Sequence, residues 1–223
     1  MYNGGKNGSG VYQFIINQIP PHFKYIELFM GSGAIMRHKS PALVNHGIDI
    51  DESINNKFPF PDSIDVDFYG LSWDEYFELP CIHCNKGAFI YADPPYLMAT
   101  RKSKKKLYSY EFSIDDHKKL LEQLKRLECM IMISSYRNDL YDRELCGWRR
   151  VEYNAYDRTH EMRIECLYCN YPAPEELHDY RYLGKDFGER QRIRRKINRH
   201  VEKLKNLPVL ERKAILGALL QYR

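Results

Sequence analysis

The sequence lacks any long apolar stretch. No run of about 18 consecutive apolar residues occurs, which is the length that a helix needs to cross a membrane. The first residues, 1–6, also lack the apolar core of a secretory signal peptide. We therefore expect a cytoplasmic protein without a membrane anchor, in a compartment where thiols stay reduced.

Cysteine is scarce, with six among 223 residues, but four of the six form two CxxC pairs, Cys81/Cys84 and Cys166/Cys169. Two such pairs can form a zinc site. The second pair falls in a run, 163–169, that predicts a β-strand, and residues three apart on a strand point to opposite faces. These two thiols therefore cannot hold one ion together, and we expect buried or loop thiols and no metal.

Acidic residues are few toward the C-terminal end. Residues 181–223 hold 13 Lys and Arg against 4 Asp and Glu, a net charge of +9, which leaves −5 for the first 180 residues. A helical stripe through Ile193, Ile197, Val201 and Leu204 precedes Pro208 and a second helical pattern. We expect a body of residues 1–175 and a basic helical extension of residues 176–223, which favours nucleic acid as a partner. A solvated amphipathic helix is the alternative.

The most informative stretch runs from Ala88 to Tyr96. Its first five residues, 88–92, have the composition of a short buried strand. Pro94 and Pro95 end that strand because neither can donate a backbone hydrogen bond. Asp93 is therefore expected at the C-terminal tip of a strand, on a stiff loop. In an open α/β sheet this is the edge where ligands bind.

The Asp-Pro-Pro-Tyr loop suits a planar ring that carries an amino group. The Asp93 carboxylate and the Pro94 carbonyl can accept the two N–H bonds, and Tyr96 can stack on the ring. An ordinary β-turn is the alternative. An apolar strand followed directly by this loop is a much rarer combination than an isolated Asp-Pro.

A second run, Tyr25–Phe29, predicts another strand, which leads through Gly31 and Gly33 into a helix. Glycines at such a turn let the backbone pass close to a ligand that faces the helix N-terminus. Asp49 ends the next predicted strand, 18 residues after Gly31. At about that distance a Rossmann-like fold binds ribose hydroxyls, and we favour Asp49 over Asp51 for this role. The competing nucleotide-phosphate site would lack its third glycine and a P-loop lysine.

Together these features resemble the Dam-like family of DNA N6-adenine methyltransferases, which use S-adenosylmethionine (SAM). Asp93–Tyr96 is similar to motif IV, and the pattern from Glu27 to Gly33 is similar to motif I. Residues 2–6, with their Gly-Gly-Lys, resemble motif X, and Ser134–Tyr136 resembles the strand end that follows motif IV. The motifs occur in the family's order, and the resemblance covers roughly residues 2–171.

The resemblance implies a Rossmann-like α/β fold with a mostly parallel central sheet and a helical C-terminal tail. Residues 1–175 would form the SAM-dependent catalytic domain. Glu27 is a candidate partner for the ammonium end of SAM, and Ser72 or Asp74 for its adenine. The residues implied in holding SAM are Tyr2, Lys6, Glu27, Phe29, Gly31, Gly33 and Asp49.

The reaction implied is transfer of the SAM methyl group to the exocyclic amine of adenine in DNA. Asp93 and the Pro94 carbonyl would accept the amine hydrogens and stabilise the positive charge that develops on the nitrogen. Tyr96 would stack on an adenine flipped out of the duplex, with Tyr136 lining the pocket. The reaction requires no metal.

The loop that follows Tyr96 is strongly basic, and we expect it to contact phosphates beside the flipped base. A solvated loop is the alternative. Only 42 positions separate Asp51 from Asp93, where Dam-like enzymes usually insert a target-recognition domain. DNA recognition is therefore expected to depart from the family pattern. The residues predicted to bind DNA are Arg101, Lys102, Lys104, Lys105, Lys106 and Tyr108.

Three other functions stay open. The first is the same chemistry on cytosine N4 or on RNA, although an Asp at position 93, where a Ser would be expected, argues against cytosine. The second is a DNA-binding protein on the same scaffold without catalysis, against which the intact Asp93 and glycines argue. The third is a nucleotide-binding dehydrogenase, which explains the motifs less well. The reduced recognition region suggests a bacterial or phage origin, and the oligomeric state is unknown.

Overall fold

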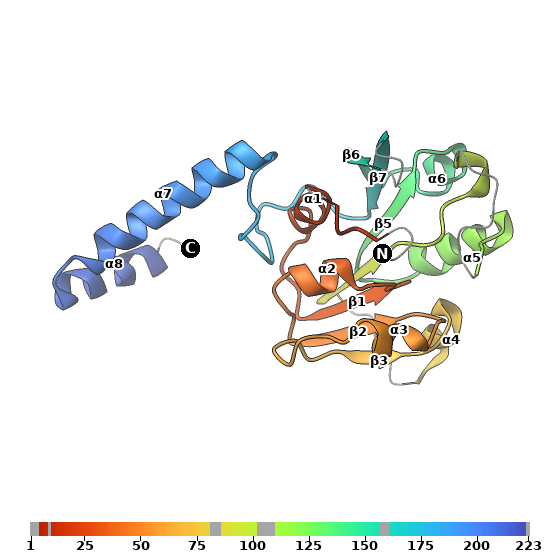
Figure 1. Ribbon diagram of the computed structural model, residues 1–223, viewed down its shortest axis with the longest axis horizontal. Helices are drawn as coiled ribbons and strands as arrows, with labels where there is room; N and C mark the ends of the chain where they lie inside the picture. Colours follow the sequence, from red (N-terminus) through yellow and green to blue (C-terminus); the bar gives the residue numbers. More distant parts are fainter. Residues whose placement is uncertain (1–4, 9, 81–85, 102–109, 157–160, 222–223) are drawn as a thin grey trace. The chain divides into compact units, whose positions relative to one another are not determined.

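A computed structural model describes the chain except for residues 1–4, 9, 81–85, 102–109, 157–160 and 222–223 (Figure 1). The chain divides into two compact units, Met1–Tyr180 and Arg181–Arg223. Each unit is described by itself. No helix in the described ranges has the length and apolar character needed to span a membrane.

The first unit is built on a seven-stranded sheet in the order β3-β2-β1-β4-β5-β7-β6 (Figure 1). All neighbouring strands pair in parallel except β7, which is antiparallel to both β5 and β6. The predicted Rossmann-like α/β fold with a mostly parallel sheet is therefore confirmed. The strands are β1 Lys24–Leu28, β2 Val44–Ile48, β3 Asp67–Tyr69, β4 Ala88–Ala92, β5 Met130–Tyr136, β6 Arg149–Tyr156 and β7 Met162–Cys169.

Helices pack against both faces of this sheet. Ile26 of β1 and Ile90 of β4 belong to the main core, which also contains residues of α4, α5 and α6. Glu27 points to the opposite face, where it bonds to α2. The helices of this unit are α1 Val11–Ile16, α2 Ala34–His38, α3 Ser53–Lys57, α4 Trp73–Glu78, α5 Ile114–Lys125 and α6 Asp139–Glu144, with a 3-10 turn at Met98–Thr100.

The register of the parallel strands brings three predicted site residues to one edge. Leu28 of β1 lies between Ile48 of β2 and Ala92 of β4, so these three strands end at the same level. The next residues along the chain are Phe29, Asp49 and Asp93. The predicted buried strand at 88–92 matches β4, and all five of its residues are buried.

The antiparallel strand β7 adds residues to this edge from the other end of the sequence. Tyr136, at the end of β5, pairs with Glu165 of β7, and Glu165 pairs with Tyr153 of β6. Strands β6 and β7 form an antiparallel pair along their whole length. Glu165 and Tyr153 lie three residues beyond the position that is level with Ala92, on the side where Asp93 leaves β4.

The CxxC pair of β7 lies as the strand geometry predicts. Cys166 and Cys169 are both buried and both free, three residues apart on one strand. Within the part of the chain that the structure describes, no group of three or more His, Cys, Asp or Glu is arranged to hold a metal ion. Cys81 and Cys84 lie outside the described residues.

The second unit consists of two helices, α7 Phe187–Lys205 and α8 Val209–Leu220. The break between them falls at Pro208, as the sequence indicates. Neither helix has a buried residue. Ile197 of the apolar stripe is 49% exposed, and Leu210 of α8 is 81% exposed.

We expect Ser113→Ala to destabilise the protein by about 1 kcal/mol, which denaturant unfolding would measure. The Ser113 hydroxyl accepts the Asp116 N–H at 3.1 Å, and the Asp116 carboxylate accepts the Ser113 N–H at 2.9 Å, so the first turn of α5 has a reciprocal cap. Ser63→Ala, at an exposed serine in a turn, is the control and should change stability little. Equal effects of both substitutions would show that the cap contributes nothing.

Candidate functional site

The centre of the site is the side chain of Lys6, which is only 6% exposed. Its ammonium lies 3.1 Å from Asp93 Oδ1 and 3.0 Å from Glu165 Oε2. It also donates a hydrogen bond to the Tyr96 hydroxyl. The N-terminal segment, the loop after β4 and strand β7 therefore meet at one buried cation.

Glu165 is the shared acceptor of this cluster. Besides Lys6, it accepts the Tyr153 hydroxyl at 2.6 Å and the Tyr96 hydroxyl at 2.9 Å, all at Oε2. Glu165 and Tyr153 are not among the site residues predicted from the sequence. The available signal was a single acidic residue among mostly apolar residues of a strand, because a buried charge needs a partner.

Aromatic rings enclose the cluster. The ring of Tyr96 meets that of Tyr136 edge to face, with centroids 4.6 Å apart, and Lys6 lies 4.7 Å from the centroid of Tyr96. Tyr153 stacks on Phe14 of α1 at 5.0 Å. These contacts hold the Tyr96 hydroxyl toward Glu165 and orient its ring beside the Asp93 carboxylate.

Burial and charge set the ionisation of the two carboxyls in opposite directions. Burial raises the pKa of Asp93 to about 6, with Lys6 opposing the rise and Glu165 adding to it. Burial also works to raise the pKa of Glu165, but Lys6 and the Tyr153 hydroxyl outweigh it and hold that pKa below its usual value. Near pH 7 the cluster therefore holds two carboxylates and one ammonium.

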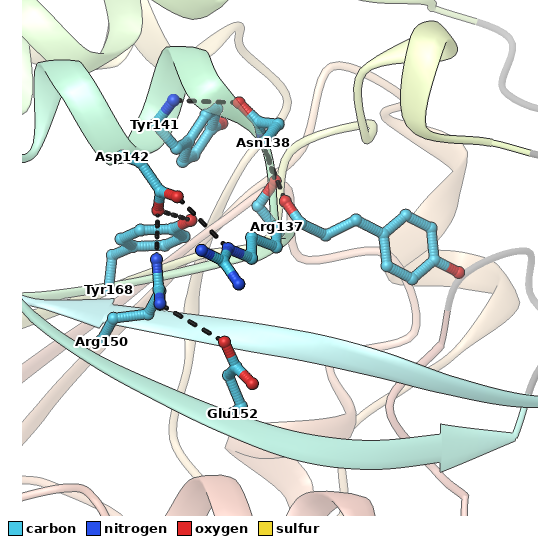
Figure 2. A network of polar contacts seen from close by, with 9 residues as sticks. Arg137, Asn138, Tyr141, Asp142, Arg150, Glu152 and Tyr168 are labelled. Carbon is cyan, nitrogen blue, oxygen red and sulfur yellow. Dashed lines mark hydrogen bonds and ion pairs between the residues drawn. The ribbon is translucent and has the colours of Figure 1, made fainter.

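The end of β5 is held by its own network (Figure 2). The Asn138 side chain donates to the Tyr136 carbonyl at 2.8 Å and accepts the Tyr141 N–H at 2.9 Å, where it caps α6. The chain after Tyr136 is thereby tied to the first turn of a helix, which orients the ring that meets Tyr96.

A charged network attaches α6 to the antiparallel strands (Figure 2). The Asp142 carboxylate accepts Arg150 at 2.7 Å and the Tyr168 hydroxyl at 2.9 Å, and Arg137 lies 3.4 Å from it. Arg150 also pairs with Glu152 at 3.5 Å. The network contains two acidic and two basic side chains, so their charges balance. Its contacts fix α6 on β6 and β7.

The glycine-rich turn after β1 has the backbone conformation that the motif requires. Gly31 and Gly33 have φ of 51° and 64°, in the left-handed region that favours glycine. Phe29 also has a positive φ, 59°. A side chain at position 33 would meet the Phe60 ring at 2.8 Å. The turn is therefore both left-handed and closely packed.

Asp49 supports this turn from the neighbouring strand. Its Oδ2 accepts the Gly31 N–H at 2.8 Å, and its Oδ1 accepts the Asp51 N–H at 3.0 Å. Burial raises the pKa of Asp49, and these two backbone hydrogen bonds oppose the rise. Each oxygen retains a second lone pair that can accept a further hydrogen bond.

Glu27 lies beneath the same turn. One oxygen of its carboxyl group, Oε2, accepts the Met36 N–H of α2 at 2.9 Å and the Tyr25 hydroxyl at 3.0 Å. Burial raises the pKa of Glu27 to about 8, against these two hydrogen bonds. Its contacts join β1 to α2, and its contact with a ligand ammonium stays a prediction.

Several other predicted residues have different surroundings. Arg101 has a side chain only 4% exposed and pairs with Glu111 at 2.7 Å, so its phosphate contact stays a prediction. Ser72 caps α4 through a reciprocal contact with Glu75. Asp74, the alternative to Ser72, lies in the first turn of α4, and its adenine contact stays a prediction. Six further predicted residues lie outside the described part of the chain; they are Tyr2, Lys102, Lys104, Lys105, Lys106 and Tyr108.

Residues 77–164 match the family model of the D12 class N6 adenine-specific DNA methyltransferases. The match includes β4, the Asp93–Tyr96 loop and the end of β5. It confirms the predicted resemblance to this family over these elements. The glycine-rich turn and Lys6 lie outside the matched residues. Among curated proteins, none matches the sequence.

Solved structures with a similar chain path include three methyltransferases. A Pyrococcus abyssi tRNA (uracil-54, C5)-methyltransferase, in complex with S-adenosyl-L-homocysteine, has a TM-score of 0.46 and 14% identity over 72% of this chain and 38% of its own. The methyltransferase subunit of a Streptococcus thermophilus type I restriction-modification system has a TM-score of 0.45 and 13% identity over 75% of this chain and 45% of its own. A Lactobacillus delbrueckii ribosomal protein L11 methylase has a TM-score of 0.46 and 13% identity over 71% of this chain and 76% of its own. The chain thus spans less than half the length of the first two.

Glu27→Gln is expected to gain stability relative to the parent as pH rises. With a pKa raised from 4.5 to about 8, the folded parent keeps a proton that the unfolded chain releases, so its stability falls with rising pH across that window. Gln stays neutral and retains an oxygen for the Met36 N–H. The advantage should grow by up to about 1.4 kcal/mol per pH unit.

Denaturant unfolding at about pH 5 and about pH 8 measures this difference. Glu175→Gln, at an exposed glutamate, is the control and should keep a constant difference from the parent. A Glu27→Gln curve parallel to that of the parent would show that Glu27 is ionised throughout.

Proposed function

We propose that this protein transfers the methyl group of SAM to the N6 amine of adenine in DNA. The observation that carries the proposal is the Asp93 carboxylate, which follows the buried strand β4 beside the glycine-rich turn and faces a buried ammonium at 3.1 Å. The family match across this loop supports adenine in DNA as the substrate. A carboxylate that holds an ammonium at this distance has the geometry to hold an amine.

The turn and its neighbours fit the chemistry of SAM. Asp49 has lone pairs free for ribose hydroxyls while it holds the Gly31 N–H. Gly31 and Gly33 adopt the left-handed conformation that lets the backbone of the turn approach a ligand closely. The excess of carboxylate at Asp93 and Glu165 favours a cationic ligand nearby. When bound, SAM supplies a methyl group on a sulfonium sulfur, and the amine nitrogen forms its N–C bond as the C–S electron pair stays on sulfur.

Asp93 and the Pro94 carbonyl prepare the amine. Its lone pair is delocalised into the adenine ring, and two acceptors placed at its hydrogens favour a pyramidal nitrogen with a localised pair. The positive charge that develops on the nitrogen is stabilised by the same acceptors. Asp93 is also positioned to take the proton that the nitrogen releases after transfer.

Without substrate, the Lys6 ammonium occupies the place beside Asp93 Oδ1 that the substrate amine requires. Both donors require the same carboxylate, so the ammonium must move off Asp93 for the N6 amine to bind. Glu165, 3.0 Å from the ammonium, retains Lys6 when it moves. The cluster then presents an ionised Asp93 to the amine at neutral pH without exposing a buried, unpaired charge.

Tyr96 holds the adenine ring in register with these acceptors. Its hydroxyl is fixed by Glu165 at 2.9 Å, and its edge contact with Tyr136 sets the tilt of the ring. A base reaches this position only after it leaves the duplex stack, and stacking on Tyr96 offsets part of that free-energy cost.

Incubation with methyl-labelled SAM and unmethylated duplex DNA, followed by digestion to nucleosides, tests the proposal. We expect labelled N6-methyladenine, and a loss of at least about a hundredfold in rate for Asp93→Asn, which replaces an acceptor by an amide. Asp115→Asn, at an exposed aspartate of α5, is the matched control. Label on cytosine, or an unchanged rate in Asp93→Asn, would contradict the proposal.

The pH dependence of kcat/KM should show that Lys6 and Glu165 control the ionisation of Asp93. The parent should lose activity as pH falls through about 6, because Asp93 then becomes protonated. Lys6 lowers the pKa of Asp93 and Glu165 raises it. Lys6→Met should therefore move the acidic limb to higher pH, and Glu165→Gln should move it to lower pH. A purely structural role for the two residues predicts no such opposite movement.

A further inference from the structure

One face of α7 carries a continuous row of cations. The positions recur at intervals of three and four residues, which places them on the same side of a helix. From its first to its last member the row spans 12 residues, or about 16 Å of helix. Its members are Arg192, Arg195, Lys196, Arg199 and Lys203.

Most of this row is free of carboxylates. Glu189 of the same helix pairs with Arg192 at 3.2 Å, and Glu202 pairs with Lys205, which lies on another face, at 2.8 Å. Among the residues that the structure describes, no carboxylate pairs with the other four cations of the row. Their charges therefore face outward without compensation.

A shallow, open pocket of about 560 Å³ lies on this face of α7. Five residues line it, three of them arginines: Gly188, Arg192, Arg195, Asn198 and Arg199. Guanidinium groups bind phosphate oxygens through two parallel hydrogen bonds, and an amide can donate one more. The arginines and the asparagine that line this pocket can therefore donate hydrogen bonds to an extended anion, and none of the five lining residues is acidic.

Duplex DNA fits this face better than a membrane surface does. Both are anionic, but the proposed substrate is DNA, and the first 180 residues have a net charge of −5, which repels phosphates. The 42 positions between Asp51 and Asp93 leave little chain for a recognition domain. The second unit carries +9 and can supply the missing affinity.

We propose that the cationic row of α7 binds the phosphate backbone of duplex DNA without regard to sequence. This rests on the proposed function for the identity of the polyanion. The second unit then holds the protein on DNA, while selection of the adenine is left to the first unit.

Two matched double variants of the full chain test this. Arg195→Gln with Arg199→Gln removes two arginines from the row. Arg190→Gln with Arg194→Gln removes two arginines at the same spacing, about 140° around the helix from Arg195 and Arg199. The two proteins have equal net charge, and circular dichroism verifies that both keep the helix content of the parent.

The measurement is the affinity for a labelled duplex of scrambled sequence as a function of salt. We expect the Arg195/Arg199 variant to lose about two units from the slope of log K against log salt and to bind about tenfold or more weakly near 0.1 M salt. The Arg190/Arg194 variant should retain the parent slope. Equal slopes for the two variants would overturn the proposal.

Further arms separate other outcomes. If the row binds vesicles of anionic lipid or an RNA duplex, and duplex DNA binding is the same in both variants, the partner is wrong. If the parent transfers no methyl group to DNA yet the two variants still differ in salt slope, the proposed function fails and the DNA-binding face stands. Transfer by the parent with identical DNA binding in both variants overturns the inference alone.

Discussion

The buried ammonium of Lys6 is the interaction on which the rest of the site depends. Two carboxylates in a poorly solvated pocket repel each other, and each alone would be driven toward its protonated form. Lys6, at 3.1 Å from Asp93 and 3.0 Å from Glu165, favours the ionised form of both carboxyl groups, so that both can accept hydrogen bonds. With one cation to two carboxylates, the pocket retains a negative excess, which stabilises positive charge on a reacting nitrogen.

The sheet determines which residues can join this cluster. Parallel strands β2, β1 and β4 end at one level, so the turn that would hold the donor and the loop that would hold the amine lie side by side. The antiparallel strand β7 then brings Glu165 to the same edge from the far end of the first unit. Both carboxylates are held by the sheet, because Asp93 directly follows the buried strand β4 and Glu165 is a buried residue of β7.

The local features were predictable because they follow from short-range physics. The apolar composition of 88–92 and the two prolines after it predict a strand that ends at Asp93, and β4 ends there. Contacts between side chains from distant parts of the sequence were harder to predict. A lone acid in the strand Met162–Cys169 indicates that a partner exists, but the identity of that partner depends on the position of Lys6, 159 residues earlier. Asp49 was predicted as a ribose contact, and its support of the Gly31 N–H depends on a register that one sequence does not encode locally.

The most direct test is the structure of the protein with S-adenosylhomocysteine and a duplex that contains the target adenine. The account predicts the N6 amine within hydrogen-bond distance of Asp93 Oδ1, with the Lys6 ammonium displaced from Asp93 and retained by Glu165. An adenine bound elsewhere, with Lys6 still on Asp93, would contradict the claim that the ammonium occupies the place of the substrate amine.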